Sequence, residues 1–84
     1  MNSPAPVPDH QTAVTNLILM LAPHVREHAL GSVFPGPIDV VLSPDTVFEP
    51  DLIFIRAERE EKLVRDRIWG APDLVVEIFP PPRA

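Results

Sequence analysis

The sequence predicts a small domain of mixed α/β class, and three observations support this prediction. Apolar residues in the first third recur at helical spacing, later runs are apolar and rich in β-branched residues, and proline or glycine separates the segments. The chain has 84 residues, which is enough for one domain. It has no cysteine, so neither a disulfide framework nor a thiolate site is available.

The first predicted element is a helix that follows a proline-rich tail. Residues 1–8 alternate proline with small residues, a pattern typical of an extended segment. Asp9 is suited to cap a helix that begins near His10. The apolar stripe of this helix consists of Val14, Leu17, Ile18, Leu21 and Val25. We expect Pro23 to kink or split the helix and the pair at 30–31 (Leu-Gly) to end it.

Three strands and a short helix are predicted next. The strands are expected at residues 38–42, 47–55 and 73–79, and a surface helix is expected at 57–65, before the last strand. Pro50 has no backbone donor, so the second strand either bulges there or begins at Asp51. The domain is therefore expected to span residues 9–79, with a proline-rich end at 80–84 outside it.

The placement of charge draws attention to two carboxylates. The net charge of −5 argues against a general electrostatic attraction to nucleic acid. Asp51 and Glu77 each belong to an apolar run, where an ionised carboxylate is costly unless it is paired, protonated or bound to a cation. No basic residue lies within 31–55, which favours a bound metal ion or partners from elsewhere in the fold. If the two strands are neighbours, the two acids can converge on one side of the sheet.

Each of these residues also has a simpler interpretation. Glu77 is equally suited to be a strand-end carboxylate in solvent, or to pair with an arginine of the 56–67 segment. Asp51 follows a proline and suits a turn. The three histidines lack the spacing of a metal site, except for His24 and His28, whose i, i+4 spacing is also ordinary on a helix surface.

Two blocks of the sequence resemble a known family. Residues 49–55 (EPDLIFI), with AER at 57–59, and residues 70–78 (GAPDLVVEI) are similar to the Uma-type family of restriction-endonuclease-like proteins. That family belongs to the PD-(D/E)XK nuclease superfamily, and the resemblance covers residues 10–78. It implies a partial restriction-endonuclease-like core, with an N-terminal helix, three strands and a short helix before the last strand. It also implies a bacterial, magnesium-dependent hydrolase that acts on DNA phosphodiesters.

The resemblance also assigns residues to the site. Asp51 and Glu77 match the catalytic carboxylates and would hold Mg²⁺ or Mn²⁺, with the backbone carbonyl of Ile78 as a third ligand. Asp73 belongs to the same block and is expected to support the structure rather than bind the ion. Nucleases of this kind need a lysine beside the metal, but the position two residues after Glu77 is Phe79.

Members of the family continue with a helix that supplies the lysine and with a closing strand, whereas this sequence continues with Pro80-Pro81-Pro82. We therefore expect the closing helix and strand to be absent and the 84 residues to be inactive as a nuclease. The alternative is a catalytically dead remnant that serves as an interaction or oligomerisation module through an open sheet edge.

The sequence also shows no recognisable targeting signal. Its start has no cationic region followed by an apolar one, and its longest apolar stretch is too short to span a bilayer. We expect a cytoplasmic protein without a membrane partner.

Overall fold

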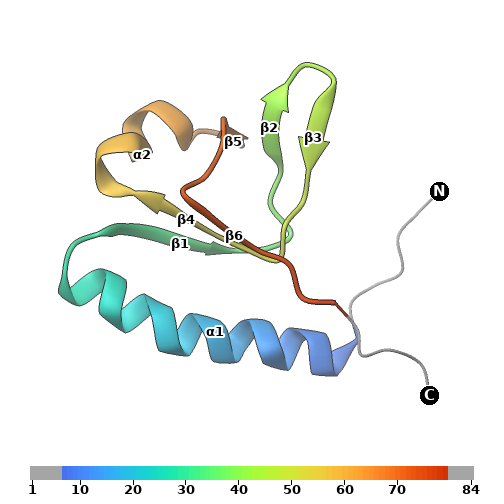
Figure 1. Cartoon of the computed structure of the whole chain (residues 1–84), viewed down its shortest axis with the longest axis vertical. Coiled ribbons are helices and arrows are strands. Elements are labelled where there is room, and N and C mark those ends of the chain that lie inside the picture. The colour runs from blue at the N-terminus through green and yellow to red at the C-terminus, as the bar shows by residue number, and fades with distance from the viewer. Residues whose placement is uncertain (1–6, 80–84) are drawn as a thin grey trace.

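The computed structural model describes residues 7–79, which form two helices and six strands (Figure 1). In chain order the elements are α1 (Pro8–Glu27), β1 (Gly31–Pro35), β2 (Val40–Ser43), β3 (Thr46–Phe48), β4 (Leu52–Arg56), α2 (Ala57–Leu63), β5 (Ile68–Trp69) and β6 (Leu74–Val76). The first sheet has the order β1-β4-β6 and is antiparallel throughout. The second has the order β3-β2-β5, and its β2–β5 pair is parallel. The predicted mixed α/β class is confirmed.

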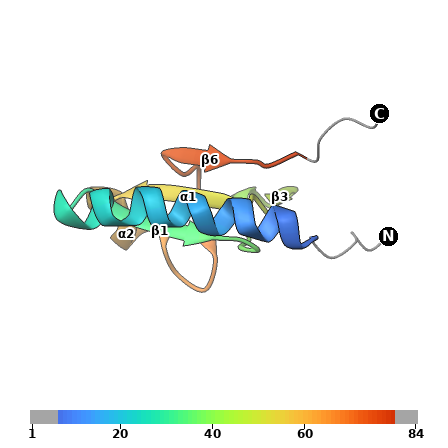
Figure 2. The same cartoon turned by 90° about the horizontal axis from the view of Figure 1, so that it is seen from below.

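Strand β4 lies at the centre of the first sheet, and its two faces pack against different elements. The core on one face joins β4 to α2 and to the second sheet through Val40, Ile53, Ile55, Leu63 and Ile68. On the other face, Phe54 lines a small cavity together with Leu21 and Val25 of α1. Helix α1 thus runs along one side of the sheet, with α2 and the second sheet on the other side (Figure 1). Figure 2 shows β6 at the edge of the sheet, next to β4.

Helix α1 begins earlier than predicted and without the expected cap from Asp9. Its first residue is Pro8, its N-cap is Val7, and no side chain caps it. Proline suits this position because its φ is already helical and its missing N–H would have had no partner there. Pro8 therefore belongs to the helix rather than to the tail. Val7 is the other described residue of the predicted tail. Residues 1–6 and the proline-rich end at 80–84 lie outside the described residues.

Pro23 does not split α1, which continues to Glu27. Pro23 is exposed, so water can reach the backbone around the carbonyl that loses its helical donor. Of the predicted stripe, Val14 and Val25 are buried. Within residues 7–79, neither helix combines the length and the apolar character that crossing a membrane requires.

The C-terminal end of α1 differs from the predicted Leu-Gly stop. The last turn closes with hydrogen bonds from the N–H of Leu30 to the carbonyl of Val25 (3.0 Å) and from the N–H of Ala29 to the carbonyl of Arg26 (3.2 Å). This is the Schellman arrangement, in which the residue after the cap is left-handed and is usually glycine. Here that residue is Ala29, with φ of 50°.

The sequence did not predict β1 or β5. Gly31 starts β1 rather than ending the helix. The residue must be glycine because a Cβ at this position would collide with the carbonyl oxygen of Ile55 on β4. β5 has only two residues, too few to show a periodic pattern. Its pairing with β2 depends on contacts from distant parts of the chain.

Four other elements differ from the prediction. The strand predicted at 38–42 is β2, at Val40–Ser43. The strand predicted at 47–55 is divided into β3 and β4, with Pro50 between them, so the alternative of a new strand near Asp51 is the better description. Helix α2 ends at Leu63 instead of residue 65. β6 covers only Leu74–Val76, so Glu77 lies just beyond its end.

Replacing Ala29 with glycine should stabilise the fold. A left-handed conformation strains an L residue but not glycine, and Ala29 is exposed, so no packing is lost. After subtracting the greater freedom of glycine in the unfolded chain, we expect Ala29→Gly to raise the free energy of unfolding by about 0.5 kcal/mol. Urea denaturation followed by circular dichroism measures this change. Ala22→Gly in the same helix is the control and should destabilise the protein; a loss of stability in both variants would contradict the prediction.

Candidate functional site

The two predicted carboxylates come from neighbouring strands. In the antiparallel pair of β4 and β6, Leu52 lies opposite Val76. The next positions outward are Asp51 and Glu77, so the register places them across from each other at the end of the sheet. The condition that the sequence left open, that the two strands are neighbours, is therefore met.

Asp51 is held firmly by backbone groups. Its Oδ2 accepts a hydrogen bond of 2.7 Å from the N–H of Ile78, and its own N–H donates to the carbonyl of Val76 at 3.2 Å. Its carbonyl accepts a 2.8 Å bond from the N–H of Gly36, just after β1. The side chain is 20% exposed. Asp51 is thus a half-buried carboxylate with a fixed position and one oxygen, Oδ1, directed away from the strand pair.

Asp73 makes the matching contacts at the other end of the same strand pair. Its Oδ2 accepts a 2.8 Å bond from the N–H of Arg56, its Oδ1 pairs with Arg59 at 2.9 Å, and its N–H donates to the carbonyl of Phe54 at 3.0 Å. Each acid therefore precedes one strand and binds a backbone N–H at the far end of the other. The structural role expected for Asp73 agrees with these contacts.

Of the interpretations of Glu77, a carboxylate covered within a strand is wrong, and a strand-end carboxylate in solvent is confirmed. Glu77 is exposed because β6 ends at Val76 and lies at the edge of the sheet, where no further layer covers it within the described residues. The cost of burying a charge, which first drew attention to Glu77, therefore does not apply. The remaining reason to consider Glu77 as a site residue is its position opposite Asp51.

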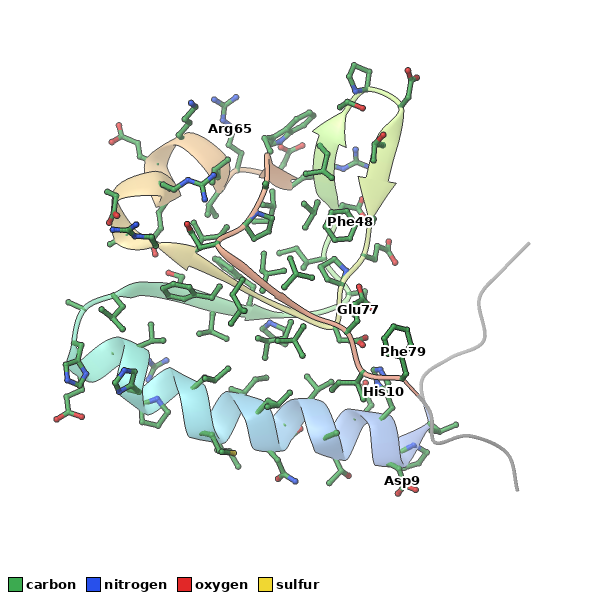
Figure 3. All side chains as sticks on the ribbon, viewed as in Figure 1. Asp9, His10, Phe48, Arg65, Glu77 and Phe79 are labelled. Carbon is green, nitrogen blue, oxygen red and sulfur yellow. The ribbon has the colours of Figure 1, made fainter. Side chains whose placement is uncertain are left out.

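His10 also belongs to this site, although its sequence spacing did not suggest it. Its Nε2 lies 3.1 Å from Oδ1 of Asp51, and its Nδ1 lies 3.1 Å from Oε1 of Gln11. The hydrogen bond to Gln11, the contact with Asp51 and the charges of Asp51 and Glu77 raise the pKa of His10, while desolvation opposes the shift. Figure 3 shows His10, Glu77 and Phe79 at the same end of the molecule, near the first turn of α1.

Two of the other strand acids find cations elsewhere in the fold. Asp39 pairs with Arg67 at 2.9 Å, and Asp73 pairs with Arg59. Arg59 and Arg67 of the 56–67 segment thus pair with these two acids, rather than with Glu77 as one interpretation had it. Neither Asp51 nor Glu77 pairs with an arginine or lysine within residues 7–79.

The donor set fits a hard divalent ion only in part. Two carboxylates with water molecules suit Mg²⁺, which is commonly held by one or two carboxylates. Within residues 7–79, however, no three His, Cys, Asp or Glu side chains are already grouped to hold a metal ion. An ion at this place would rely on Asp51, on a movement of the exposed Glu77, and on water.

The site has no lysine of its own among the residues of this sequence. The single lysine, Lys62, is on α2, which begins after β4 has carried the chain roughly 15 Å away from Asp51. Phe79, two residues after Glu77, is 81% exposed.

Comparison with known families identifies the group to which these residues belong. The family model Uma2, described as "Putative restriction endonuclease", matches residues 1–82. The chain belongs to the Uma2 family. The resemblance inferred from the two sequence blocks is thereby confirmed, and a nuclease-like function is consistent with the family. Comparison with curated proteins found no match.

The Asp73 contacts predict a specific dependence of stability on pH. The N–H of Arg56 and the guanidinium of Arg59 lower the pKa of Asp73, with desolvation acting in the opposite direction. Since the native pKa is below that of the unfolded chain, this contribution to stability is complete above about pH 4 and is lost as the pH falls through the native pKa. Asp73→Asn should therefore lower the melting temperature at neutral pH, and its difference from the unmodified protein should shrink in acid.

Thermal melts between neutral and acid pH measure this difference. Arg59→Gln removes the partner instead of the acid and should show the same trend. A difference between Asp73→Asn and the unmodified protein that stays constant across the whole range would contradict the prediction.

Proposed function

We propose that this member of the Uma2 family carries the divalent-metal site of a DNA endonuclease, with Asp51 and Glu77 as the carboxylate ligands. The observation that carries the proposal is the pairing of β4 with β6, whose register sets the two acids opposite each other. Mg²⁺ or Mn²⁺ is the expected ion, and the backbone carbonyl of Ile78 is the proposed third ligand.

The residues of this chain would have separate tasks. Asp51 is the fixed ligand, because the N–H of Ile78 orients its carboxylate. Glu77, being exposed, is the adaptable one. An ion held there would polarise a phosphodiester and lower the pKa of an attacking water. It would also offset two negative charges that otherwise repel DNA from a chain with net charge −5.

We further infer that the 84 residues do not cleave DNA by themselves. Stabilising the charge that develops on the phosphate requires a cationic donor beside the metal. Lys62 lies on a distant helix, and the position after Ile78 is occupied by Phe79. Cleavage would therefore require a lysine or an equivalent group from outside these 84 residues.

Metal binding and cleavage can be tested separately. In calorimetric titrations, Mg²⁺ and Mn²⁺ should bind the unmodified chain and should bind at least about tenfold more weakly to Asp51→Asn and to Glu77→Gln. Both substitutions keep the size of the side chain, and asparagine at 51 keeps an oxygen for the N–H of Ile78. Asp45→Asn, in the exposed turn between β2 and β3, is the control.

The same proteins, incubated with plasmid DNA and Mg²⁺, test catalysis. We expect no nicking above the level of Asp51→Asn. Equal metal affinity in all variants would refute the metal site, and nicking by the unmodified chain alone would refute the inference that it is inactive.

One observation supports a second candidate function, that of an interaction module. β6 is an edge strand, and its Leu74 and Val75 are 45% and 37% exposed. An apolar edge strand invites pairing with another strand, and we take a second copy of this chain as the partner.

This candidate predicts a dimer that a charge on the edge disrupts. Size-exclusion chromatography with light scattering should give the mass of a dimer for the unmodified chain and of a monomer for Val75→Lys. Leu19→Lys, at a more exposed apolar position on α1, is the control and should stay dimeric. A monomer at every concentration for the unmodified chain would dismiss the candidate.

A further inference from the structure

His10 and Asp51 face each other at a distance that suits two ligands of one ion. Nε2 of His10 and Oδ1 of Asp51 are 3.1 Å apart, and both side chains are 20% exposed. Two ligand atoms at right angles around an ion, each roughly 2.1 Å from it, lie roughly 3.0 Å apart. The observed separation agrees with this geometry.

Each of these atoms is oriented by a neighbour, and the two atoms pair with each other. Oδ2 of Asp51 accepts the N–H of Ile78, so Oδ1 remains on the side of His10. Nδ1 of His10 donates to Oε1 of Gln11, so Nε2 faces Asp51, and in the neutral ring Nε2 has a lone pair that an ion can take in place of the proton shared with Asp51. A hydrogen bond of this kind, on the ring nitrogen that does not bind metal, is typical of histidine ligands.

We propose that His10 is a metal ligand of this site, adjacent to Asp51 in the octahedral coordination shell of a first-row transition-metal ion such as Co²⁺. The inference rests on the proposed function for its use of Asp51, and it adds a nitrogen ligand that changes the class of ion. Imidazole favours transition metals, whereas Mg²⁺ takes oxygen ligands almost exclusively.

Glu77, the backbone carbonyl of Ile78 and water complete the shell. Glu77 is exposed and follows β6 opposite Asp51, so its side chain has room to move toward the ion. This accounts for the lack of a preassembled group of three side chains within residues 7–79. His10 and Asp51 are already oriented, and Glu77 would join them when the ion binds.

A second histidine pair must be removed before the site is tested. His24 and His28 lie one turn apart at the other end of α1, with ring centroids 4.5 Å apart, and such a pair can bind transition metals by itself. The experiments therefore use a background in which both are alanine, with circular dichroism to verify that α1 is retained.

In this background, calorimetry with Co²⁺ and with Mg²⁺ measures the choice of ion. We expect Co²⁺ to bind at least about tenfold more tightly than Mg²⁺, following the general order of metal affinities. His10→Ala should remove this preference, lowering the affinity for Co²⁺ by about tenfold or more while that for Mg²⁺ changes little.

His10→Gln separates a ligand from a positioning residue. Glutamine can still donate a hydrogen bond to Asp51 but offers no imidazole nitrogen. If His10 binds the ion, the Gln variant should lose Co²⁺ as the Ala variant does. Paramagnetic shifts of the His10 ring protons on addition of Co²⁺, seen by NMR in the His24→Ala, His28→Ala background, give a readout independent of affinity.

The possible results distinguish this inference from the proposed function. If Asp51→Asn abolishes binding of Mg²⁺ or Mn²⁺ but His10→Ala or His10→Gln leaves Co²⁺ affinity unchanged, the inference fails and the proposed function stands. If Co²⁺ binding depends on His10 while Mg²⁺ and Mn²⁺ do not bind, the inference stands and the proposed magnesium chemistry fails. If none of these ions binds, both are wrong.

Discussion

The pairing of β4 with β6 is the constraint on which the rest of this structure depends. β4 is the central strand, with Leu52, Ile53 and Ile55 fully buried, and β6 has only three residues to attach to it. Such a short edge strand gains little stability from its own backbone hydrogen bonds. The reciprocal bonds of Asp51 and Asp73, each to a backbone N–H of the opposite strand, hold the pair at both ends.

In this arrangement the carboxylate of Asp51 has two roles, a structural contact and a candidate metal ligand. One oxygen of Asp51 holds Ile78, and the other faces His10. Asp73 has the same structural task, yet its second oxygen is neutralised by Arg59. The difference between the two acids therefore lies in their neighbours: a guanidinium at one end of the strand pair, and an imidazole with an exposed carboxylate at the other. The charge-assisted bond of Asp73 to a guanidinium leaves no room for a metal ion, whereas the imidazole and the exposed carboxylate beside Asp51 are groups that can bind one.

The candidate site is assembled by three segments that are far apart in the sequence. His10 comes from the first turn of α1, Asp51 from the bend before β4, and Glu77 from the end of β6. The long helix brings its N-terminal turn to the site because it runs the length of the sheet (Figure 1). Its packing against β1 and β4 thus decides whether the imidazole reaches Asp51. A shift of the helix by a single turn, about 5 Å, would remove His10 from the site.

The sequence by itself determined the mixed class, the family, most of the first helix and the existence of the strands beside Asp51 and Glu77, but not that these strands pair. These follow from local periodicity and from two specific sequence blocks. Only the tertiary structure decided that Glu77 is exposed, that Asp73 takes Arg59, and that His10 faces Asp51. β1 and β5 also depend on it, because a strand that begins with glycine or has two residues is defined by its partner. Side-chain burial and contacts between distant segments depend on how the layers pack, and no local pattern encodes that packing.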